Sequence, residues 1–203
     1  VIVPVYNKAP HLKACFDCLE CQTISKSDLE VLLIDDGSTD DSLALCEAFA
    51  AERPWVRVIA QPNAGVSEAR NAGIRAANGR YLFFLDPDDS LSPETLENVS
   101  MFFESCPDEI DLVTYPIVSI RDGKRQRLHH RYDVLRETGV YDLTLPENAT
   151  VAQATMNVAV RNCFDGNVLF DFAPANGVIV HEDEKYCTDV LQGSMQLGFC
   201  AEA

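Results

Sequence analysis

Two aspartates one residue apart follow an apolar segment near the middle of the chain. Asp86 and Asp88 flank Pro87 directly after residues 81–85, and Asp89 adds a third carboxyl group. Carboxylate oxygens are the ligands that Mg²⁺ and Mn²⁺ prefer, and both ions readily complete their shell with phosphate oxygens. The spacing therefore predicts a cation site that could hold a diphosphate, although the same residues also suit a turn and a helix cap.

A second acidic motif follows an earlier apolar run. Residues 31–34 lead directly into Asp35-Asp36-Gly37-Ser38. A carboxylate at a strand end can accept a hydrogen bond from a nucleobase N–H or a ribose hydroxyl. The same residues also suit the N-cap of a following helix, and both interpretations can hold for different residues. Asp35, Asp36 and Ser38 are therefore candidates for nucleoside binding.

An aromatic and a basic side chain could contact the same ligand. Tyr6 ends the first apolar segment and could stack on a nucleobase, although a tyrosine in such a place is more often simply half-buried. Arg70 lies in residues 63–73, where small side chains would let a helix approach a sheet closely. It is a candidate for contact with the nucleotide or its phosphates, or for a structural ion pair.

A third acidic group lies near the end of the chain. Glu182, Asp183 and Glu184 follow His181 at the start of a predicted helix. Acidic residues in a first helical turn usually complement the helix dipole. A carboxylate there could also act as a general base at the mouth of the sheet.

The elements that must position these residues alternate between strands and helices. The pattern predicts strands at residues 1–5, 31–34, 56–59, 81–85 and 112–120, and helices at 10–22, 40–52 and 67–77 and from Ser92-Pro93-Glu94 onward. This order indicates an α/β fold with a mostly parallel sheet covered on both faces, and ligands bind at the carboxyl ends of such strands. The regularity weakens after residue 120, where we expect a strand at 158–160 and a helix at 182–192.

Composition narrows the class of protein. A chain of 203 residues with 47% hydrophobic and 24% charged residues fits one soluble globular domain. Its formal charge of −16 disfavours nucleic acid as a partner and implies that a phosphate ligand would need a divalent cation. No apolar run reaches membrane-spanning length, no leader is visible, and the first residue is Val1. We therefore expect a piece of a longer cytoplasmic protein.

Two further residue clusters are explained more simply by structure than by chemistry. Cys15, Cys18 and Cys21 are spaced like one face of a helix, but a zinc site would need a fourth ligand, so reduced thiols are the favoured interpretation. Basic residues gather between Arg121 and Arg131. A solvated hairpin or loop is favoured there over a loop that faces phosphate or acceptor.

Four motifs in this order resemble the N-terminal half of family 2 glycosyltransferases, which have the GT-A fold. They are Val1-Ile2-Val3-Pro4-Val5-Tyr6-Asn7, Asp35-Asp36-Gly37-Ser38-Thr39-Asp40, residues 65–73, and the segment from Gly79-Arg80-Tyr81 to Asp86-Pro87-Asp88-Asp89. His181-Glu182-Asp183 resembles an acidic motif that follows in the same family, and residues 124–156 resemble bacterial members that decorate surface polymers. The resemblance implies one domain over residues 1–203, with a Rossmann-like donor half at 1–105 and an irregular acceptor-side half at 106–203.

The resemblance also implies an activity and a set of site residues. It implies inverting transfer of a sugar from a nucleotide sugar, expected to be a UDP-sugar, to a hydroxyl of a glycan, lipid-linked or polyol-phosphate acceptor. Asp183 would be the catalytic base, and Asp86 and Asp88 would bind Mn²⁺ or Mg²⁺. The implied donor-binding residues are Pro4, Val5, Tyr6, Asn7, Asp35, Asp36, Ser38, Arg70 and Asp86. If the product is a surface glycan, the protein would work at the inner face of the plasma membrane.

Three other functions compete with this interpretation. A non-catalytic nucleotide- or carbohydrate-binding module could keep the fold, and Asp189 stands where many relatives carry a basic residue. A phosphohydrolase of the haloacid dehalogenase type also places Asp-x-Asp after an apolar strand, but it leaves the Asp35-Asp36 motif unexplained. A sugar nucleotidyltransferase is disfavoured because Tyr6-Asn7-Lys8 replaces its Gly-rich first loop.

Overall fold

Strands and helices alternate through the first half of the chain. The computed structural model describes residues 1–105 continuously and then 112–114, 120–121, 124–125, 140–142, 158–162, 170–172, 179–181 and 196–199. The elements of the first half are β1 (Ile2–Val5), α1 (Ala9–Glu20), β2 (Val31–Asp35), α2 (Ser42–Ala50), β3 (Val56–Ala60), α3 (Val66–Ala76), β4 (Tyr81–Phe83) and α4 (Thr95–Ser105). The predicted alternation is confirmed, with bounds that differ by a few residues at most.

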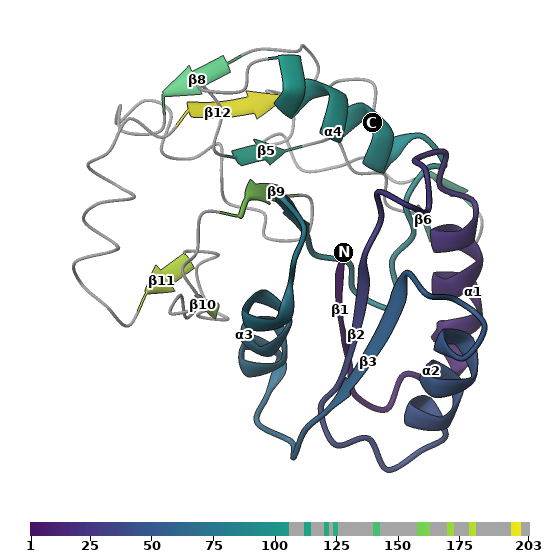
Figure 1. Cartoon of the computed structure of the whole chain (residues 1–203). Helices are drawn as coiled ribbons and strands as arrows, with labels where there is room; N and C mark the ends of the chain where they lie inside the picture. Colours follow the sequence, from purple (N-terminus) through teal and green to yellow (C-terminus); the bar gives the residue numbers. More distant parts are fainter. Residues whose placement is uncertain are drawn as a thin grey trace.

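The first three strands form a parallel sheet with β2 in the middle. Val3 pairs with Leu33, and Leu33 pairs with Val58. Every residue of β1 and β2 is buried, which explains why both strands are apolar on both faces up to Asp35, the last residue of β2, instead of alternating. Figure 1 shows α3 on one side of this sheet and α1 and α2 on the other, as predicted for an α/β fold.

The sheet continues from β1 into a second, mixed part. Ile2 forms a parallel bridge with Phe84, and the Leu85 N–H donates to the Ile2 carbonyl at 3.0 Å. The strand order in the second sheet is β4-β9-β5-β12-β8, from β5 (Leu112–Thr114), β8 (Val140–Asp142), β9 (Val158–Arg161) and β12 (Gln196–Phe199). This second sheet is mixed, because β9 runs antiparallel to both β4 and β5 whereas β12 runs parallel to β5.

Two short antiparallel pairs complete the described backbone. The first joins β6 (Ile120–Arg121) to β7 (Lys124–Arg125), which confirms a hairpin at the start of the basic segment. The second joins β10 (Phe170–Phe172) to β11 (Ile179–His181). The predicted strand at 112–120 is described only as β5 and the first residue of β6, and the predicted helix at 182–192 lies outside the described residues.

The start predicted for the fourth helix is wrong. Ser92 and Pro93 do not begin the helix, because α4 starts at Thr95 and residues 93–94 form a turn. The buried side chain of Gln22 explains the shift: its Nε2 donates to the Ser92 carbonyl at 2.9 Å, and its Oε1 accepts from the Leu96 N–H at 3.2 Å. A glutamine from a distant segment therefore caps this helix.

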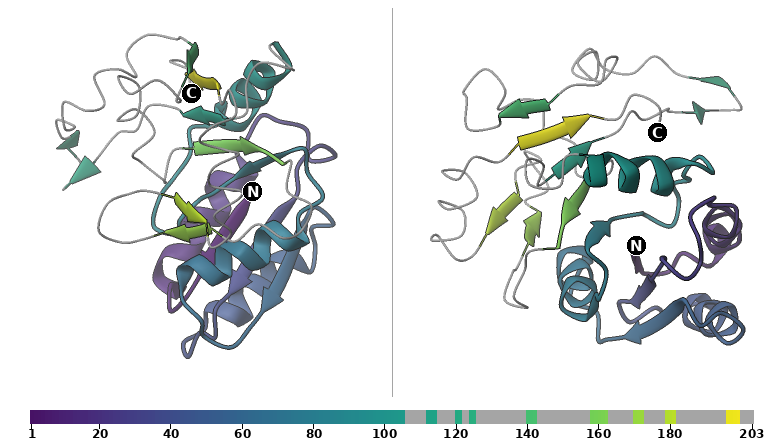
Figure 2. Two further views of the ribbon diagram at one scale, coloured as in Figure 1. Left: turned by 90° about the vertical axis from the view of Figure 1, so that its left-hand side faces the viewer. Right: turned by 45° about the horizontal axis from the view of Figure 1, so that its top comes forward.

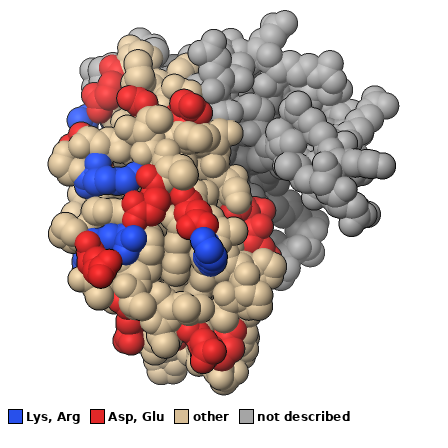
Figure 3. Space-filling view, turned by 90° about the vertical axis from the view of Figure 1, so that its right-hand side faces the viewer, with Lys and Arg blue, Asp and Glu red and all other residues tan. Residues whose placement is uncertain are grey.

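The outer face of α1 and α2 carries both signs of charge. Figure 3 shows Lys and Arg intermingled with Asp and Glu on the side where these helices lie, with no large area of one sign. The ion pairs there include Lys13 with Asp17 and Arg53 with Glu20. Among the described residues, no helix is both long and apolar enough to cross a membrane.

The cysteines of the first half are free thiols in different environments. Cys15 and Cys46 are buried, Cys18 is half-buried and Cys21 is exposed. Burial raises the pKa of Cys15 and of Cys46 to about 12. In the described parts of the chain, no three potential metal-binding side chains come together. The structure thus supports the interpretation of reduced thiols.

Close contact between α3 and β1 depends on a glycine. A Cβ atom on Gly73 would lie 2.4 Å from Cγ2 of Ile2, a residue that is 1% exposed. The helix α3 can therefore approach β1 this closely only at a residue without a side chain. This requirement accounts for the small residues of the motif at residues 65–73.

Gly73→Ala tests this packing constraint. We expect a loss of about 1–3 kcal/mol in the free energy of unfolding, because the added methyl group must displace the strand or the helix. Denaturant unfolding measures the loss. Gly79→Ala is the matched control, since the nearest atom to its Cβ would be 3.4 Å away. Equal stability of the two variants would contradict the conclusion that close packing of α3 on β1 requires Gly73.

Candidate functional site

The sequence motifs lie in loops that follow the parallel strands. Tyr6 and Asn7 follow β1, Asp36 and Ser38 follow β2, and residues 61–65 follow β3. Residues 84–89 follow β4, which runs on into the parallel bridge with β1. Because the carboxyl ends of parallel strands meet at one edge, these loops share the edge at which α/β proteins bind ligands.

Asp36 connects the loop after β2 to the loop after β3. Its Oδ1 accepts hydrogen bonds from Gln61 Nε2 at 2.7 Å and from the Ala64 N–H at 2.9 Å. Its Oδ2 accepts from the Gly65 N–H at 2.8 Å, and the side chain is almost fully buried. The carboxylate that was predicted to meet the nucleoside therefore also fixes the loop that leads into α3.

Asp35 and Gly37 complete this turn. Asp35 is 2% exposed, and its Oδ2 accepts from the Ser38 N–H at 3.2 Å. Within the described part of the chain, Asp35 Oδ1 is buried without a hydrogen-bond partner. Gly37 has a φ of 71°, and a Cβ there would lie 2.7 Å from the Asn63 backbone nitrogen. The turn thus requires glycine for both its dihedral angle and its close approach.

Asn7 connects the loop after β1 to the loop after β2. Its Oδ1 accepts from the Thr39 N–H at 2.8 Å, the Thr39 hydroxyl at 3.2 Å and the Asp40 N–H at 3.3 Å. Its own N–H donates to Ser38 Oγ at 3.0 Å, and its φ of 51° is in the left-handed region that asparagine tolerates. The side chain of Asn7 is thereby engaged within the protein, while Tyr6 beside it is 47% exposed.

The remaining residues of the first two motifs have structural surroundings. Pro4 and Val5 are buried within β1. Asp40 lies just before α2, and its carboxylate accepts from the Ser42 N–H at 3.0 Å and from the Ala9 N–H at 3.2 Å, so it links the starts of α2 and α1. The N-cap residue of α2 is Asp41, whose side chain makes no capping hydrogen bond, so the structure does not confirm the N-cap interpretation of the acidic motif.

Arg70 and Asp86 form a largely buried ion pair. The distance from Arg70 Nη2 to Asp86 Oδ1 is 2.8 Å, and the side chains are 7% and 22% exposed. Arg70 was predicted either to contact the nucleotide or to form a structural ion pair. The structure shows the ion pair, which joins α3 to the loop after β4. Removing one member of such a pair is costly because the other charge remains buried.

Asp88 pairs with a lysine that the sequence motifs did not single out. Lys8 Nζ lies 2.6 Å from Asp88 Oδ2, and the two side chains are 34% and 45% exposed. The hydrogen bond from Lys8 holds the pKa of Asp88 below its usual value. Burial, followed by the charges of Asp86 and Asp88, raises the pKa of Asp89. The loops after β1 and β4 thus bring four charged groups close together: Lys8, Asp86, Asp88 and Asp89.

The chemistry of these carboxylates fits a hard divalent cation in part. Asp86 and Asp88 supply the oxygen donors that Mg²⁺ and Mn²⁺ prefer. However, no group of three or more metal-binding side chains forms within the described ranges. A cation here would have to complete its coordination shell with oxygens from a ligand and from water.

The predicted base cannot be compared with these residues. Asp183 lies outside the described residues, between His181 at the end of β11 and Gln196 at the start of β12. Sequence reasoning also missed Lys8 and Gln61. Lys8 directly follows the first motif, and Gln61 directly follows β3, so their positions at strand ends were the available signal.

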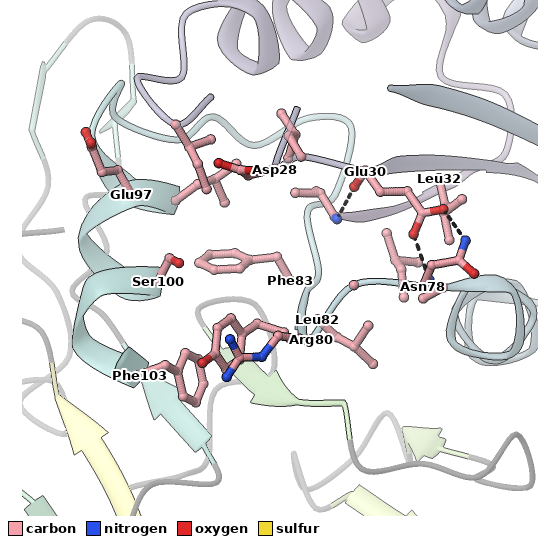
Figure 4. Close-up of a pocket in the computed structure, with 18 of the residues that line it drawn as sticks. Asp28, Glu30, Leu32, Asn78, Arg80, Leu82, Phe83, Glu97, Ser100 and Phe103 are labelled. Carbon is pink, nitrogen blue, oxygen red and sulfur yellow. Dashed lines mark hydrogen bonds between the residues drawn. The ribbon is translucent and has the colours of Figure 1, made fainter. Parts of the chain in front are cut away.

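A cavity in the described part of the chain lies away from these loops. It measures about 550 Å³ and is lined by residues at the amino-terminal ends of β1, β2 and β4, among them Val1, Glu30 and Tyr81. Figure 4 shows Glu30 turned toward Asn78, which donates to it from both its backbone and its side chain at 2.8 Å. Because the motifs gather at the opposite edge of the strands, this cavity is separate from the candidate site.

Comparison with known proteins identifies the fold. The chain superposes on Staphylococcus aureus TarS residues 1–349 in complex with UDP with a TM-score of 0.77 at 21% identity, covering 100% of this chain and 57% of that one. It superposes on the mannosyltransferase PcManGT from Pyrobaculum calidifontis, solved with GDP-Man and Mn²⁺, with a TM-score of 0.69 at 20% identity, covering 98% of this chain and 53% of that one. The fold is the GT-A fold of glycosyltransferases.

Sequence comparison identifies the family. Residues 1–171 match the family described as Glycosyl transferase family 2, and the chain belongs to it. The Bacillus subtilis minor teichoic acid biosynthesis protein GgaB is 42% identical over all of this chain and 22% of its own length. The B. subtilis glycosyltransferase EpsJ is 40% identical over 56% of this chain and 32% of its own length. The chain thus spans between a fifth and a third of these relatives, and the comparison leaves no support for a phosphohydrolase or a nucleotidyltransferase.

Asp36→Asn tests the connection between the loops after β2 and β3. An amide nitrogen must replace one of two oxygens that face N–H donors, so we expect a loss of about 1–3 kcal/mol in the free energy of unfolding. Amide hydrogen exchange should accelerate over residues 61–65. Asp41→Asn serves as the control, because Asp41 is exposed and its side chain makes no capping hydrogen bond. Unchanged exchange over residues 61–65 would refute the connection.

Proposed function

We propose that this chain carries the donor site and the catalytic base of an inverting glycosyltransferase. The donor is a UDP-sugar, and the acceptor is a hydroxyl of a cell-surface glycan or a polyol-phosphate polymer. The observation that carries the proposal is the gathering of Tyr6, Asp36, Asp86 and Asp88 in loops at the carboxyl edge of a parallel sheet. Family membership supports the reaction type.

The relatives support the choice of donor and acceptor. The TarS structures include complexes with UDP and with UDP-GlcNAc, which favours a uridine nucleotide over other donors. GgaB is named for minor teichoic acid biosynthesis, which favours a cell-surface polymer as the product. The mannosyltransferase solved with GDP-Man and Mn²⁺ supports a divalent cation. We propose Mn²⁺ or Mg²⁺ as that cation, and the inner face of the plasma membrane as the place of reaction.

Each proposed site residue has a role that follows from its chemistry and its place in the site. Tyr6, exposed at the end of β1, offers its ring to the uracil, and Asp36 accepts from the base or ribose. Asp86 and Asp88 would hold the divalent cation, which supplies positive charge opposite the leaving diphosphate. Arg70 holds Asp86 in place through the ion pair. Asp183 takes the proton of the acceptor hydroxyl as that oxygen attacks the anomeric carbon from the face opposite the nucleotide.

Calorimetry with UDP and CDP, each with and without Mn²⁺, tests the donor site. We expect the wild-type chain to bind UDP more tightly with Mn²⁺, and Asp88→Asn to remove most of that dependence because a charged cation ligand is lost. Asp17→Asn is the matched control, since Asp17 is exposed on α1 and pairs with Lys13. Failure of the wild-type chain to bind either nucleotide, with or without Mn²⁺, would overturn the proposal for this chain.

A second substitution tests the base. Asp183→Asn should leave UDP binding unchanged and lower the rate of sugar transfer by about 10²–10⁴-fold, because the amide cannot accept the proton. The readout is release of UDP from a UDP-sugar in the presence of acceptor. Normal transfer by this variant would show that another group is the base. Donor binding without any transfer by the wild-type protein would favour the non-catalytic binding module.

A further inference from the structure

The two carboxylates of the Asp-Pro-Asp motif are paired with two different kinds of basic side chain. Asp86 is held by Arg70, whose side chain is only 7% exposed and comes from α3. Asp88 is held by Lys8, which is 34% exposed and lies in the loop after β1. Arginine favours fixed, buried pairs, whereas lysine is a compact, well-hydrated charge on a flexible stem. The difference suggests a fixed pair at Asp86 and an exchangeable pair at Asp88.

The backbone of Lys8 is fixed while its side chain crosses the edge of the sheet. The Lys8 N–H donates to Ser42 Oγ at 2.9 Å, and the Lys8 carbonyl accepts from the His11 N–H at 2.9 Å and the Leu12 N–H at 3.3 Å. The side chain then reaches Asp88, 80 residues further along the chain. Movement of the ammonium group away from Asp88 therefore requires only side-chain rotation.

The charges around Asp88 favour such a movement when a ligand arrives. The charges of Asp86 and Asp88 act on Asp89, and the Lys8 ammonium group partly compensates both Asp88 and Asp89. A divalent cation at Asp88 would repel that ammonium group, because both would approach the same carboxylate. A diphosphate bound to the same divalent cation would give the displaced Lys8 ammonium group a new anionic partner, still within reach of the loop after β1.

We infer that Lys8 is a resident counter-cation for Asp88, and that its ammonium group moves to the donor diphosphate when a divalent cation binds. The inference rests on the proposed function and adds a residue to it. Lys8 occupies Asp88 in the free protein and contacts the diphosphate in the complex. It therefore weakens binding of the cation alone and strengthens binding of the cation together with the nucleotide.

Lys8→Met separates these two effects, because they have opposite signs. Binding of Mn²⁺ alone, measured by electron paramagnetic resonance, should become about threefold tighter once the competing charge is removed. Binding of UDP at saturating Mn²⁺, measured by calorimetry, should become roughly tenfold weaker once a charge-assisted hydrogen bond is lost. Lys8→Arg should restore most of the UDP affinity, and Lys13→Met is the control because Lys13 is exposed and pairs with Asp17 on α1.

Wild-type protein provides a measurement that does not depend on the folding of a variant. The ¹³C signal of the Lys8 side-chain carbon next to Nζ should shift when Mg²⁺ and UDP are added together, and the Lys13 signal should not. If wild-type protein binds Mn²⁺ and UDP but Lys8→Met changes neither affinity, or changes both in the same direction, the inference is overturned and the proposed function stands. If wild-type protein binds neither Mn²⁺ nor UDP, both the inference and the proposed function are overturned.

Discussion

Three carboxylates at the carboxyl edge of the sheet are compensated by donors or basic side chains from other parts of the chain, and the rest of the site depends on these contacts. Buried or crowded carboxylates are stable only with donors or cations beside them. Asp36 takes two backbone N–H groups and a glutamine, Asp86 takes Arg70, and Asp88 takes Lys8. These contacts run between different loops, so compensation of the charge also fixes the loops relative to one another.

The scaffold behind this edge is closely packed, for reasons that can be traced to a few residues. The parallel strands β1 and β2 are buried along their whole length, and Gly73 lets α3 lie directly on Ile2. The bridge between Ile2 and Phe84 attaches the second sheet next to β1. Figure 2 shows the two parts from other directions, with α4 lying across the second sheet. The loop that carries Asp86 and Asp88 therefore begins at a fixed point beside the loop of Lys8.

The contrast between the two ion pairs bears on how such a site can accept a ligand. The pair of Arg70 and Asp86 is enclosed, so it holds the backbone after β4 in one position. The pair of Lys8 and Asp88 is exposed, and exposed ion pairs contribute little to stability. A site built from one fixed and one exchangeable pair keeps its shape while one carboxylate changes partner. Such an arrangement suits an acidic protein that receives a diphosphate, as we propose for this chain.

Local sequence alone determined the α/β alternation of residues 1–105, the buried character of β1 and β2, and the family, because each depends on short-range patterns and on motif order. Tertiary structure decided which carboxylates meet which partners. Lys8 finds Asp88 across 80 residues, Gln22 moves the start of α4 to Thr95, and Asn7 turns its side chain toward residues 39–40. No local pattern encodes such contacts, since they arise only when parallel strands bring the ends of separate loops to one edge.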